Sequence, residues 1–524
     1  MTKYPIGVQA FENIIEEKFL YVDKTRLVYD LAQQHVCFLS RPRRFGKSLL
    51  ISTLDAYFSG RKELFEGLGI MELEHEWAQH PVFRIDFANG NFNIEGNLQS
   101  ILNGMVGQWE LQYGRDPLQQ DLGMRFKYVL QQAHRQTGRK AVVLVDEYDK
   151  PMLDVLGDPM EQKNRDTLKA FYSTFKAADA DLRFVLLTGV TKFSQITVFS
   201  GFNQPKDISM DPHYDALCGI TEEELYKYFP EGIRELAEEE EVDEETMKAM
   251  LKKHYDGYHF SKKLLDIYNP FSIINALDQK RLSDFWYRSG TPTYLAKLIE
   301  GHSVNMQRLL SRWHEEDYFV NYRADAEDPL AMLYQAGYLT IKDYTREDKT
   351  YLLDYPNDEV RRGMATLIAN GYFTAKEEDL SPWMISVNRM LREGRTEDAR
   401  EAFTSFLASI PFTANKDERA LDFESHYQYT FYLIFRMLCC CTTAIEKCNS
   451  KGRADIILEY ARHIYVIEFK LDGTAAEALE QIDRQQYALP YLGDPRQLHK
   501  IGVSISSRSR TVEEWEERSG CAGN

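Results

Sequence analysis

The fold is decided by a stretch near the N-terminus, VCFLSRPRRFGKS, which occupies residues 36–48. The stretch begins as an apolar strand, passes through a basic turn and ends where a helical pattern of leucines begins. This context suits phosphate binding, because the backbone N–H groups at a helix N-terminus point toward the anion. Lys47 would then reach the outer phosphates of a nucleotide, and the Ser48 hydroxyl would help to hold Mg²⁺. We therefore expect a P-loop nucleotide site at Gly46, Lys47 and Ser48.

The basic turn departs from the full P-loop pattern G-x-x-x-x-G-K-[ST], because Arg41 stands at the first glycine position. A Gly-Lys-Ser tripeptide alone is weak evidence, so the flanking strand and helix carry most of the weight. Arg43 and Arg44 in the same turn would neutralise phosphate charge within one chain or reach a neighbouring subunit. The alternative is that they pair with acids such as Asp149.

A second motif, AVVLVDE at residues 141–147, is a buried strand that ends in two acids. Asp146 would bind Mg²⁺ through water, and Glu147 would orient and deprotonate the water that attacks the γ-phosphate. A strand ending in two acids is often a surface turn, but the P-loop motif, expected on a neighbouring strand, favours the catalytic interpretation.

A further strand, residues 183–188, ends in Thr188. A hydroxyl at this sheet edge is placed to sense the γ-phosphate. The competing interpretation is an ordinary threonine at a strand end, and both stay open. Lys192 is a further, weaker candidate for the sensor.

Along the chain, 524 residues exceed what one hydrophobic core can hold, so we expect two or three domains. Residues 1–210 alternate strands and helices, which predicts a largely parallel α/β sheet. Residues 211–404 are α-rich, and residues 405–524 read as a small α/β or α+β unit. The predicted strands of the first region are 36–40, 82–87, 141–145 and 183–188, and its predicted helices include 49–58, 98–111 and 125–136.

Charge and cysteine content narrow the function classes. A formal net charge of −18 argues against nonspecific wrapping of nucleic acid, so any such contact must be local. The seven cysteines lack C-x-x-C spacing, and Cys439, Cys440 and Cys441 are consecutive, so neither a disulfide framework nor a metal site is expected. No secretion signal is visible, and the most apolar stretch, residues 429–444, is too short to span a membrane. We expect a cytoplasmic protein with no membrane partner.

These motifs resemble a known family. The turn at residues 41–48, the opening YVDKT at 21–25, DEYD at 146–149 and FSGFN at 199–203 are similar to the bacterial AAA-ATPase-like family. The resemblance covers about residues 5–205, and Arg41 matches that family's variant of the loop. It implies a RecA-like or AAA-like P-loop core that binds ATP and Mg²⁺.

Near the C-terminus, residues 454–460 and 464–470 alternate in polarity and are separated by a short turn, which predicts a β-hairpin. A two-residue turn would pair Tyr460 with His463 and put Asp455 opposite Glu468, whereas a three-residue turn would put Asp455 opposite Phe469. Either register gathers Asp455, Glu468 and Lys470. Two carboxylates and a lysine suit a Mg²⁺ site for phosphodiester cleavage. Surface salt bridges are the alternative, but both faces of these strands are too apolar for exposure.

This hairpin resembles the PD-(D/E)xK nuclease superfamily, in particular the branch fused to AAA-ATPase-like domains. The resemblance spans about residues 405–515 and implies a restriction-endonuclease-like fold. It assigns the aspartate to Asp455, the E-x-K pair to Glu468 and Lys470, and a further metal-site acid to Glu424. Gln481 and Tyr487 follow on a helix where related nucleases place substrate-orienting residues, but six residues apart they do not share one helical face.

The sequence therefore predicts a cytoplasmic ATPase with a C-terminal Mg²⁺-dependent nuclease domain, in defence or DNA processing by family analogy. Its expected cofactors are ATP and Mg²⁺. Its expected partner is nucleic acid, DNA before RNA, with a homo-oligomer left open. One observation opposes cleavage, since residues 420–524 hold 12 Lys and Arg against 15 Asp and Glu. The rival hypothesis is a nucleotide-controlled interaction module or regulator with an inactive nuclease-like domain.

Overall fold

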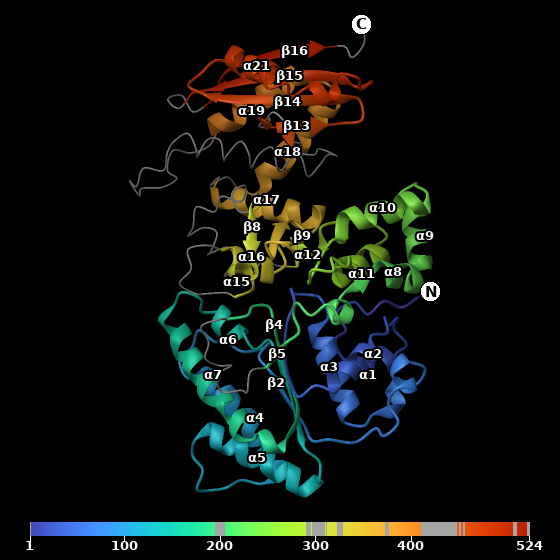
Figure 1. Cartoon of the computed structure of the whole chain (residues 1–524), viewed down its shortest axis with the longest axis vertical. Coiled ribbons are helices and arrows are strands. Elements are labelled where there is room, and N and C mark those ends of the chain that lie inside the picture. The colour runs from blue at the N-terminus through green and yellow to red at the C-terminus, as the bar shows by residue number, and fades with distance from the viewer. Residues whose placement is uncertain are drawn as a thin grey trace. The chain divides into compact units, whose positions relative to one another are not determined.

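The structure is a computed structural model of the chain, which Figure 1 shows coloured from the N-terminus to the C-terminus. It describes residues 2–193, 205–289, 295, 310, 312–321, 329–372, 377–409, 448–449, 452–453, 456–506 and 511–520. The chain forms two compact units, residues 1–360 and residues 361–524.

The N-terminal unit is built on a five-stranded sheet in the order β2-β3-β4-β1-β5. All of its neighbouring strands run parallel. The four longer strands lie where the alternating pattern predicted them, which confirms the parallel α/β sheet. Every residue of β3 is buried, as expected for a strand covered on both faces. The strands are β1 (Val36–Ser40), β2 (Val82–Asp86), β3 (Ala141–Asp146), β4 (Leu182–Gly189) and β5 (Lys206–Asp207).

The strand order corrects one expectation. Strand β4 lies between β1 and β3, so the P-loop strand and the Asp146 strand are not neighbours. In register, Leu39 of β1 is paired with Thr188 of β4, and Val145 of β3 is paired with Leu187. The carboxyl ends of all three strands therefore meet at one edge of the sheet, with Thr188 between the two motifs.

Helices cover both faces of this sheet, with α1 to α3 on one side and α4 to α7 on the other (Figure 1). The predicted helices at 49–58, 98–111 and 125–136 correspond to α3, α4 and α5. The helix bounds are α1 (Phe11–Glu16), α2 (Thr25–Ala32), α3 (Lys47–Phe58), α4 (Asn97–Tyr113), α5 (Leu122–Thr137), α6 (Lys150–Leu153) and α7 (Pro159–Ala177).

A helical cluster follows in the same unit and has its own apolar core, which includes Leu225, Leu251 and Ile273. A short antiparallel pair of strands, β6 and β7, joins its ends. The elements are β6 (Ile220–Thr221), α8 (Glu222–Tyr228), α9 (Pro230–Glu239), α10 (Glu244–Tyr255), β7 (Ile267–Tyr268), α11 (Pro270–Gln279) and α12 (Phe285–Arg288).

A small antiparallel sheet in the order β8-β10-β9 comes next. Gly337, with φ of 88°, separates α16 from β9. The sequence predicts a helix end at Gly337 followed by a short strand at residues 338–341, and the strand of the structure begins at Thr340. The elements are β8 (Trp313–Glu315), α15 (Glu316–Val320), α16 (Leu330–Gln335), β9 (Thr340–Thr345), β10 (Thr350–Asp354) and α17 (Asp358–Tyr372).

Arg41 holds the start of the P-loop in place. Its side chain is 1% exposed, and its guanidinium donates to the backbone carbonyls of Ser40 (2.9 Å), Ser209 (2.7 Å) and Tyr214 (3.1 Å). The guanidinium carbon also lies 4.0 Å from the ring centroid of Phe260. Burial lowers the pKa of Arg41, and nearby groups including Cys218 and Asp215 oppose this shift. The residue at the first glycine position thus ties the loop to segments far along the chain.

Two more P-loop residues pack against those later segments. The ring of Phe45 lies 4.8 Å from that of Tyr258 and 5.6 Å from that of Phe260. A Cβ added at Gly337 would lie 2.6 Å from the Cβ of Pro42, so a side chain there would push the two segments apart. We call Tyr258, Phe260 and Gly337 the clamp, because together they pack on Pro42, Phe45 and Arg41.

The C-terminal unit contains a four-stranded sheet in the order β13-β14-β15-β16. Strands β14 and β15 are parallel, whereas the outer pairs are antiparallel. Helix α21 packs on one face of the sheet, and α18 and α19 pack on the other. The hairpin strands are therefore buried on both faces, as their sequence predicted. The bounds are α18 (Glu377–Arg392), α19 (Thr396–Ser409), β11 (Cys448–Asn449), β12 (Gly452–Arg453), β13 (Ile456–Glu459), β14 (His463–Leu471), α21 (Ala475–Arg484), β15 (Gln497–Ile505) and β16 (Val512–Gly520).

Some sequence-based expectations concern residues that the structure does not describe: the FSGFN motif, the apolar stretch at 429–444 with its three cysteines, Glu424 and Asp455. Within the described ranges, no helix combines the length and apolar character needed to cross a membrane.

Arg41→Gly restores the full P-loop pattern, yet we expect it to destabilise the N-terminal unit by about 3 kcal/mol, because buried carbonyls lose charged donors. Thermal and urea unfolding of the nucleotide-free protein measure this change. Arg44→Gly is the matched control, since Arg44 is exposed and its φ of 67° favours glycine, so we expect a change within about 1 kcal/mol. Equal stability of Arg41→Gly and the unmutated protein would contradict this role for Arg41.

Candidate functional site

The P-loop leads directly into a helix N-terminus. Gly46, with φ of 92°, caps α3, and the first helical residue is Lys47. The left-handed backbone at Gly46 is one that glycine adopts without strain. The amides of the first helical turn have no partner within a helix, so they are suited to an anion such as phosphate.

Lys47 lies beneath the loop and is 7% exposed. Its ammonium donates to the carbonyls of Arg41 and Pro42, both at 2.9 Å. Burial lowers the pKa of Lys47, while the charges of Asp146, Asp149 and Glu147 oppose this shift. The lysine is therefore held in the loop by the carbonyls of Arg41 and Pro42, two of the three residues on which the clamp packs.

Asp146 and Thr188 form a buried pair at the carboxyl edge of the sheet. The Thr188 hydroxyl donates to Asp146 Oδ1 at 2.8 Å and lies 3.2 Å from the carbonyl of Val145. The backbone N–H of Glu147 donates to the same Oδ1 at 3.1 Å. These contacts use one carboxylate oxygen and fix the orientation of the other. Thr188 thus contacts the acid of the second motif, and it is fully buried.

Glu147 occupies a strained turn, with φ of 53°. Burial raises the pKa of its carboxyl group, and the charge of Lys47 partly opposes this shift. Asp149, suggested above as a partner for the loop arginines, instead accepts hydrogen bonds from Val190 N (2.9 Å), Thr191 N (2.6 Å) and Thr191 Oγ1 (2.8 Å). Asp149 therefore holds the segment after β4.

These motifs surround a cavity of about 300 Å³, which we call the phosphate cavity. Six predicted site residues line it, namely Arg43, Arg44, Gly46, Lys47, Ser48 and Glu147. The two arginines are exposed, and the Arg44 guanidinium lies 5.0 Å from the ring centroid of Phe271. The cavity gathers cations around the helix N-terminus, which is an arrangement suited to a polyphosphate.

Lys150, Trp286 and Tyr338 are among the residues of this cavity that were not predicted as site residues. Lys150 directly follows the DEYD motif, which was its available signal. Trp286 donates through Nε1 to the carbonyl of Arg43 at 3.0 Å, and its ring lies 5.0 Å from that of Tyr338. No pattern near these two aromatic residues indicated a nucleotide site.

An apolar cavity of about 110 Å³ also borders the P-loop at Gly46 and Leu49. Its walls come from three regions: the YVDKT motif with Tyr21, helix α3, and the segment around Cys218 and Ile220. Cys218 is buried, and burial raises the pKa of its thiol. An apolar space beside a helix N-terminus suits a flat aromatic base.

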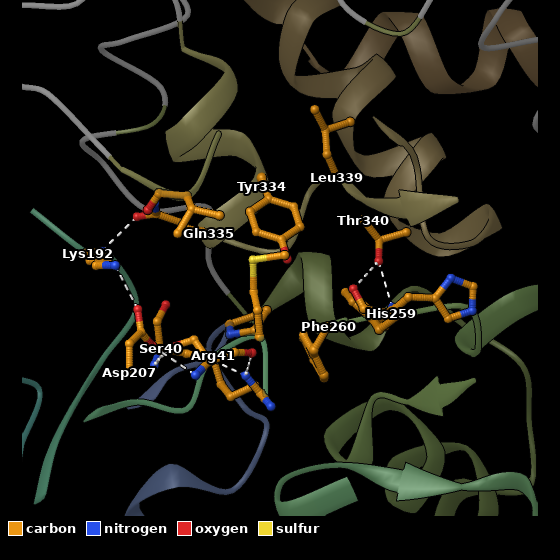
Figure 2. A pocket seen from close by; sticks show the side chains of 15 residues that line it. Ser40, Arg41, Lys192, Asp207, His259, Phe260, Tyr334, Gln335, Leu339 and Thr340 are labelled. Atoms are coloured by element: carbon orange, nitrogen blue, oxygen red, sulfur yellow. Dashed lines mark hydrogen bonds and ion pairs between the residues drawn. The ribbon is translucent and has the colours of Figure 1, made fainter. Parts of the chain in front are cut away.

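Lys192 is not among the described residues that line the phosphate cavity. Its ammonium pairs with Asp207 at 2.8 Å, and its backbone N–H donates to Gln335 Oε1 at 2.8 Å. Figure 2 shows these contacts beside a separate small cavity, where Arg41 faces Phe260 and Thr340 contacts His259. The lysine fastens the segment after β4 to α16.

In the C-terminal unit, the hairpin has the two-residue turn. Glu459 is paired with Ile464, and Tyr460 N donates to the carbonyl of His463 at 2.7 Å. This is the register for which the sequence predicted Asp455 opposite Glu468, and the three-residue alternative is wrong. Asp455 itself lies outside the described residues.

Gln481 links the two described members of the E-x-K pair. Its amide nitrogen donates to Glu468 Oε1, and its amide oxygen accepts from Lys470 Nζ at 2.6 Å. Glu468 is 2% exposed. Tyr487 instead belongs to the apolar cluster between α21 and the sheet. The structure thus brings Gln481, but not Tyr487, to the nuclease-like residues.

Among the described side chains, no three His, Cys, Asp or Glu residues are grouped as a metal site. Two of the metal ligands expected from the sequence, Glu424 and Asp455, lie outside the described residues. The described part of the C-terminal site is therefore Glu468, Lys470 and Gln481.

Comparisons with known proteins bear on both units. A family described as a predicted AAA-ATPase matches residues 5–199, and the PD-(D/E)XK nuclease superfamily matches residues 422–515. A protein of Azotobacter chroococcum mcd 1, described as an uncharacterized protein in the vnfD 5' region, is 33% identical over 525 residues, which is 97% of this chain and 98% of the relative.

Two solved structures also match, each with a TM-score of 0.23. The Aeropyrum pernix ORC2 protein, in ADPNP and ADP complexes, is 13% identical and matches over 69% of this chain and 93% of its own. The Aeropyrum pernix ORC1 protein in complex with DNA is 11% identical, over 66% and 91%. The two family matches cover the regions of the two motif sets, and the chain belongs to the AAA-ATPase-like family and carries a C-terminal PD-(D/E)XK nuclease superfamily domain.

Proposed function

We propose that the N-terminal unit binds ATP together with Mg²⁺ and hydrolyses it. The observation that carries this proposal is the phosphate cavity, which Lys47, Ser48 and Glu147 line together. The cavity lies at the carboxyl edge of a parallel sheet, the usual location of ligand sites in such folds. The phosphates would lie against the amides at the start of α3, beside the Lys47 ammonium.

The donor set fits a divalent cation. Ser48 lines the cavity, and Asp146 supplies a carboxylate whose Oδ1 is already fixed by Thr188 and the Glu147 amide. Mg²⁺ prefers oxygen ligands and keeps several of its waters, so one hydroxyl and one nearby acid are enough protein ligands. When bound, the cation would neutralise charge on the phosphate oxygens. In this account Thr188 is a positioning residue for Asp146 rather than a phosphate sensor.

Glu147 is the proposed general base. Its carboxyl group is half-buried at the cavity, and burial raises its pKa, which makes it a better proton acceptor than an exposed carboxylate. The carboxylate would orient a water and accept its proton as that water attacks the γ-phosphate. Exposed Arg43 and Arg44 would bind phosphate oxygens from the other side of the loop.

The apolar cavity beside Gly46 would receive the adenine base. Its walls include Tyr21, Val22 and Phe229, and it meets the P-loop at the same residues as the phosphate cavity. An apolar wall disfavours the additional polar groups of guanine, because these would lose their hydrogen bonds to water. We therefore propose ATP rather than GTP as the nucleotide.

Lys47→Ala should lose most nucleotide affinity, because the phosphate charge loses its buried cation, whereas Glu147→Gln should bind ATP and lower kcat by about 100-fold or more. Calorimetric titration with ATP and a phosphate-release assay measure the two effects. Lys163→Ala, on α7 and paired with Glu95 at the surface, serves as the matched control. Unchanged turnover in Glu147→Gln would contradict the assignment of the base.

We further propose that the C-terminal unit cleaves phosphodiester bonds of nucleic acid with Mg²⁺. The supporting observation is the cluster of Glu468 and Lys470 on β14 with Gln481 on α21, within a matched nuclease domain. Glu468, with Asp455 and Glu424 from the sequence, would bind the cation, and Lys470 would help to orient and deprotonate a water. DNA remains the favoured substrate, and the biological role is an analogy with the family.

The rival function is an interaction module in which the nuclease-like unit docks a partner without cleaving it. The acidic balance of residues 420–524 favours this alternative, because phosphate binding needs local positive charge. Incubation of the purified protein with labelled DNA and RNA, single- and double-stranded, with and without ATP, Mg²⁺ and Mn²⁺, separates the two functions.

If the unit is a nuclease, Lys470→Ala should lower cleavage at least about 100-fold at every metal concentration, whereas Asp455→Ala should recover partly as Mn²⁺ is raised. The difference arises because, of the two substituted residues, only Asp455 is proposed to bind the cation. Gel assays over a metal titration measure this, and ATP hydrolysis should stay unchanged. Lys500→Ala is the control, because Lys500 lies on β15 of the same sheet and pairs with Asp483 of α21. Equal cleavage by all four proteins would leave the hairpin a structural feature.

A further inference from the structure

Lys150 is a cation at the phosphate cavity that the motif analysis did not assign. The cavity lining contains four cationic side chains, those of Arg43, Arg44, Lys47 and Lys150. The first three belong to the P-loop and the start of α3. Lys150 comes from the opposite motif, at the start of α6 after β3.

A tight turn fixes Lys150 beside Glu147. The Lys150 backbone N–H donates to the Glu147 carbonyl at 3.0 Å, and Pro151 fixes the first turn of α6. The two side chains line the same cavity, and the charge of Lys150 is one of the influences that lower the pKa of Glu147. A lysine beside the proposed base is on the side from which water would attack.

The side chain of Lys150 is not committed to a strong partner. Its ammonium pairs at 3.1 Å with Asp154, four residues later and directly after the end of α6. Both side chains are about one-quarter exposed (24% and 26%), and a partly exposed ion pair of this spacing contributes little to stability. Lys47, by contrast, is buried and holds two loop carbonyls. Lys150 can therefore leave Asp154 for a triphosphate at little cost.

We propose that Lys150 is a catalytic residue that contacts the γ-phosphate and stabilises its charge during hydrolysis, within one chain. The inference rests on the proposed ATPase function. In the step itself, the water oxygen forms a bond to the γ-phosphorus, and the bond from that phosphorus to the bridging oxygen breaks with its electrons left on ADP. The water proton passes to Glu147, and Lys150 keeps its own protons. Lys150 thereby supplies the positive charge that many P-loop enzymes take from an arginine of a neighbouring protein.

Lys150→Gln should lower kcat by about 100-fold and should also weaken ATP binding, because it no longer contacts the γ-phosphate. It should also remove the preference for a non-hydrolysable ATP analogue over ADP, because only the triphosphate has the group that Lys150 touches. A purely structural residue would affect both nucleotides alike. Lys150→Arg should retain part of the activity, and Asp154→Asn should keep kcat and the preference. Lys163→Gln is the surface control.

These experiments distinguish a failure of the Lys150 inference from a failure of the proposed ATPase function. If the unmutated protein neither binds nor hydrolyses ATP, the proposed function fails. If it does both, and Lys150→Gln matches Lys163→Gln in kcat and in the ratio of the two nucleotide affinities, the inference on Lys150 is overturned. Turnover per chain should stay constant over a 100-fold dilution of the protein. A fall on dilution would show that a neighbouring chain supplies the essential charge and would overturn the action within one chain.

Discussion

The buried guanidinium of Arg41 is the constraint on which the nucleotide site depends. A P-loop ordinarily begins with glycine, but this loop begins with a charged side chain that turns inward and bonds to the carbonyls of Ser209 and Tyr214. The backbone at Arg41 is not in the left-handed region, whereas Gly46 is, so only the second glycine position requires glycine. The shape of the loop is thus set by long-range contacts as well as by its own residues.

Those contacts join the loop to the helical part of the same unit. Tyr258 and Phe260 pack on Phe45, Gly337 allows close approach to Pro42, and Trp286 bonds to the Arg43 carbonyl. Near this clamp, Tyr338 and Ala336 line the phosphate cavity. A ligand that moves the loop must therefore also move the segments packed on it, or else lose binding affinity by breaking these contacts. The segment around Ala336 and Tyr338 is therefore part of the site, although no sequence motif there indicates a function.

Much of this unit could be predicted from the sequence, because the signals were local. The parallel strands, the helix after Gly46 and the acids at the end of β3 each follow from neighbouring residues. The position of β4 between β1 and β3 could not, since strand order depends on contacts far apart in the chain. Thr188 was identified at the correct edge, but its contact with Asp146 follows from that order. In the C-terminal unit, likewise, the hairpin could be predicted from neighbouring residues. The contacts of Gln481 with Glu468 and Lys470 could not, because they depend on how α21 packs on the sheet.

Nucleotide binding at the P-loop should be transmitted to the clamp, and hydrogen–deuterium exchange measures both places in one experiment. The protein would be compared with and without Mg²⁺ and a non-hydrolysable ATP analogue, with peptides that cover residues 41–50, 256–260 and 336–341. We expect slower exchange in all three segments, because residues 256–260 and 336–341 pack on residues 41–50 and Tyr338 lines the phosphate cavity. Unchanged exchange in 41–50, or slowing confined to 41–50 while the other two segments stay the same, would contradict it.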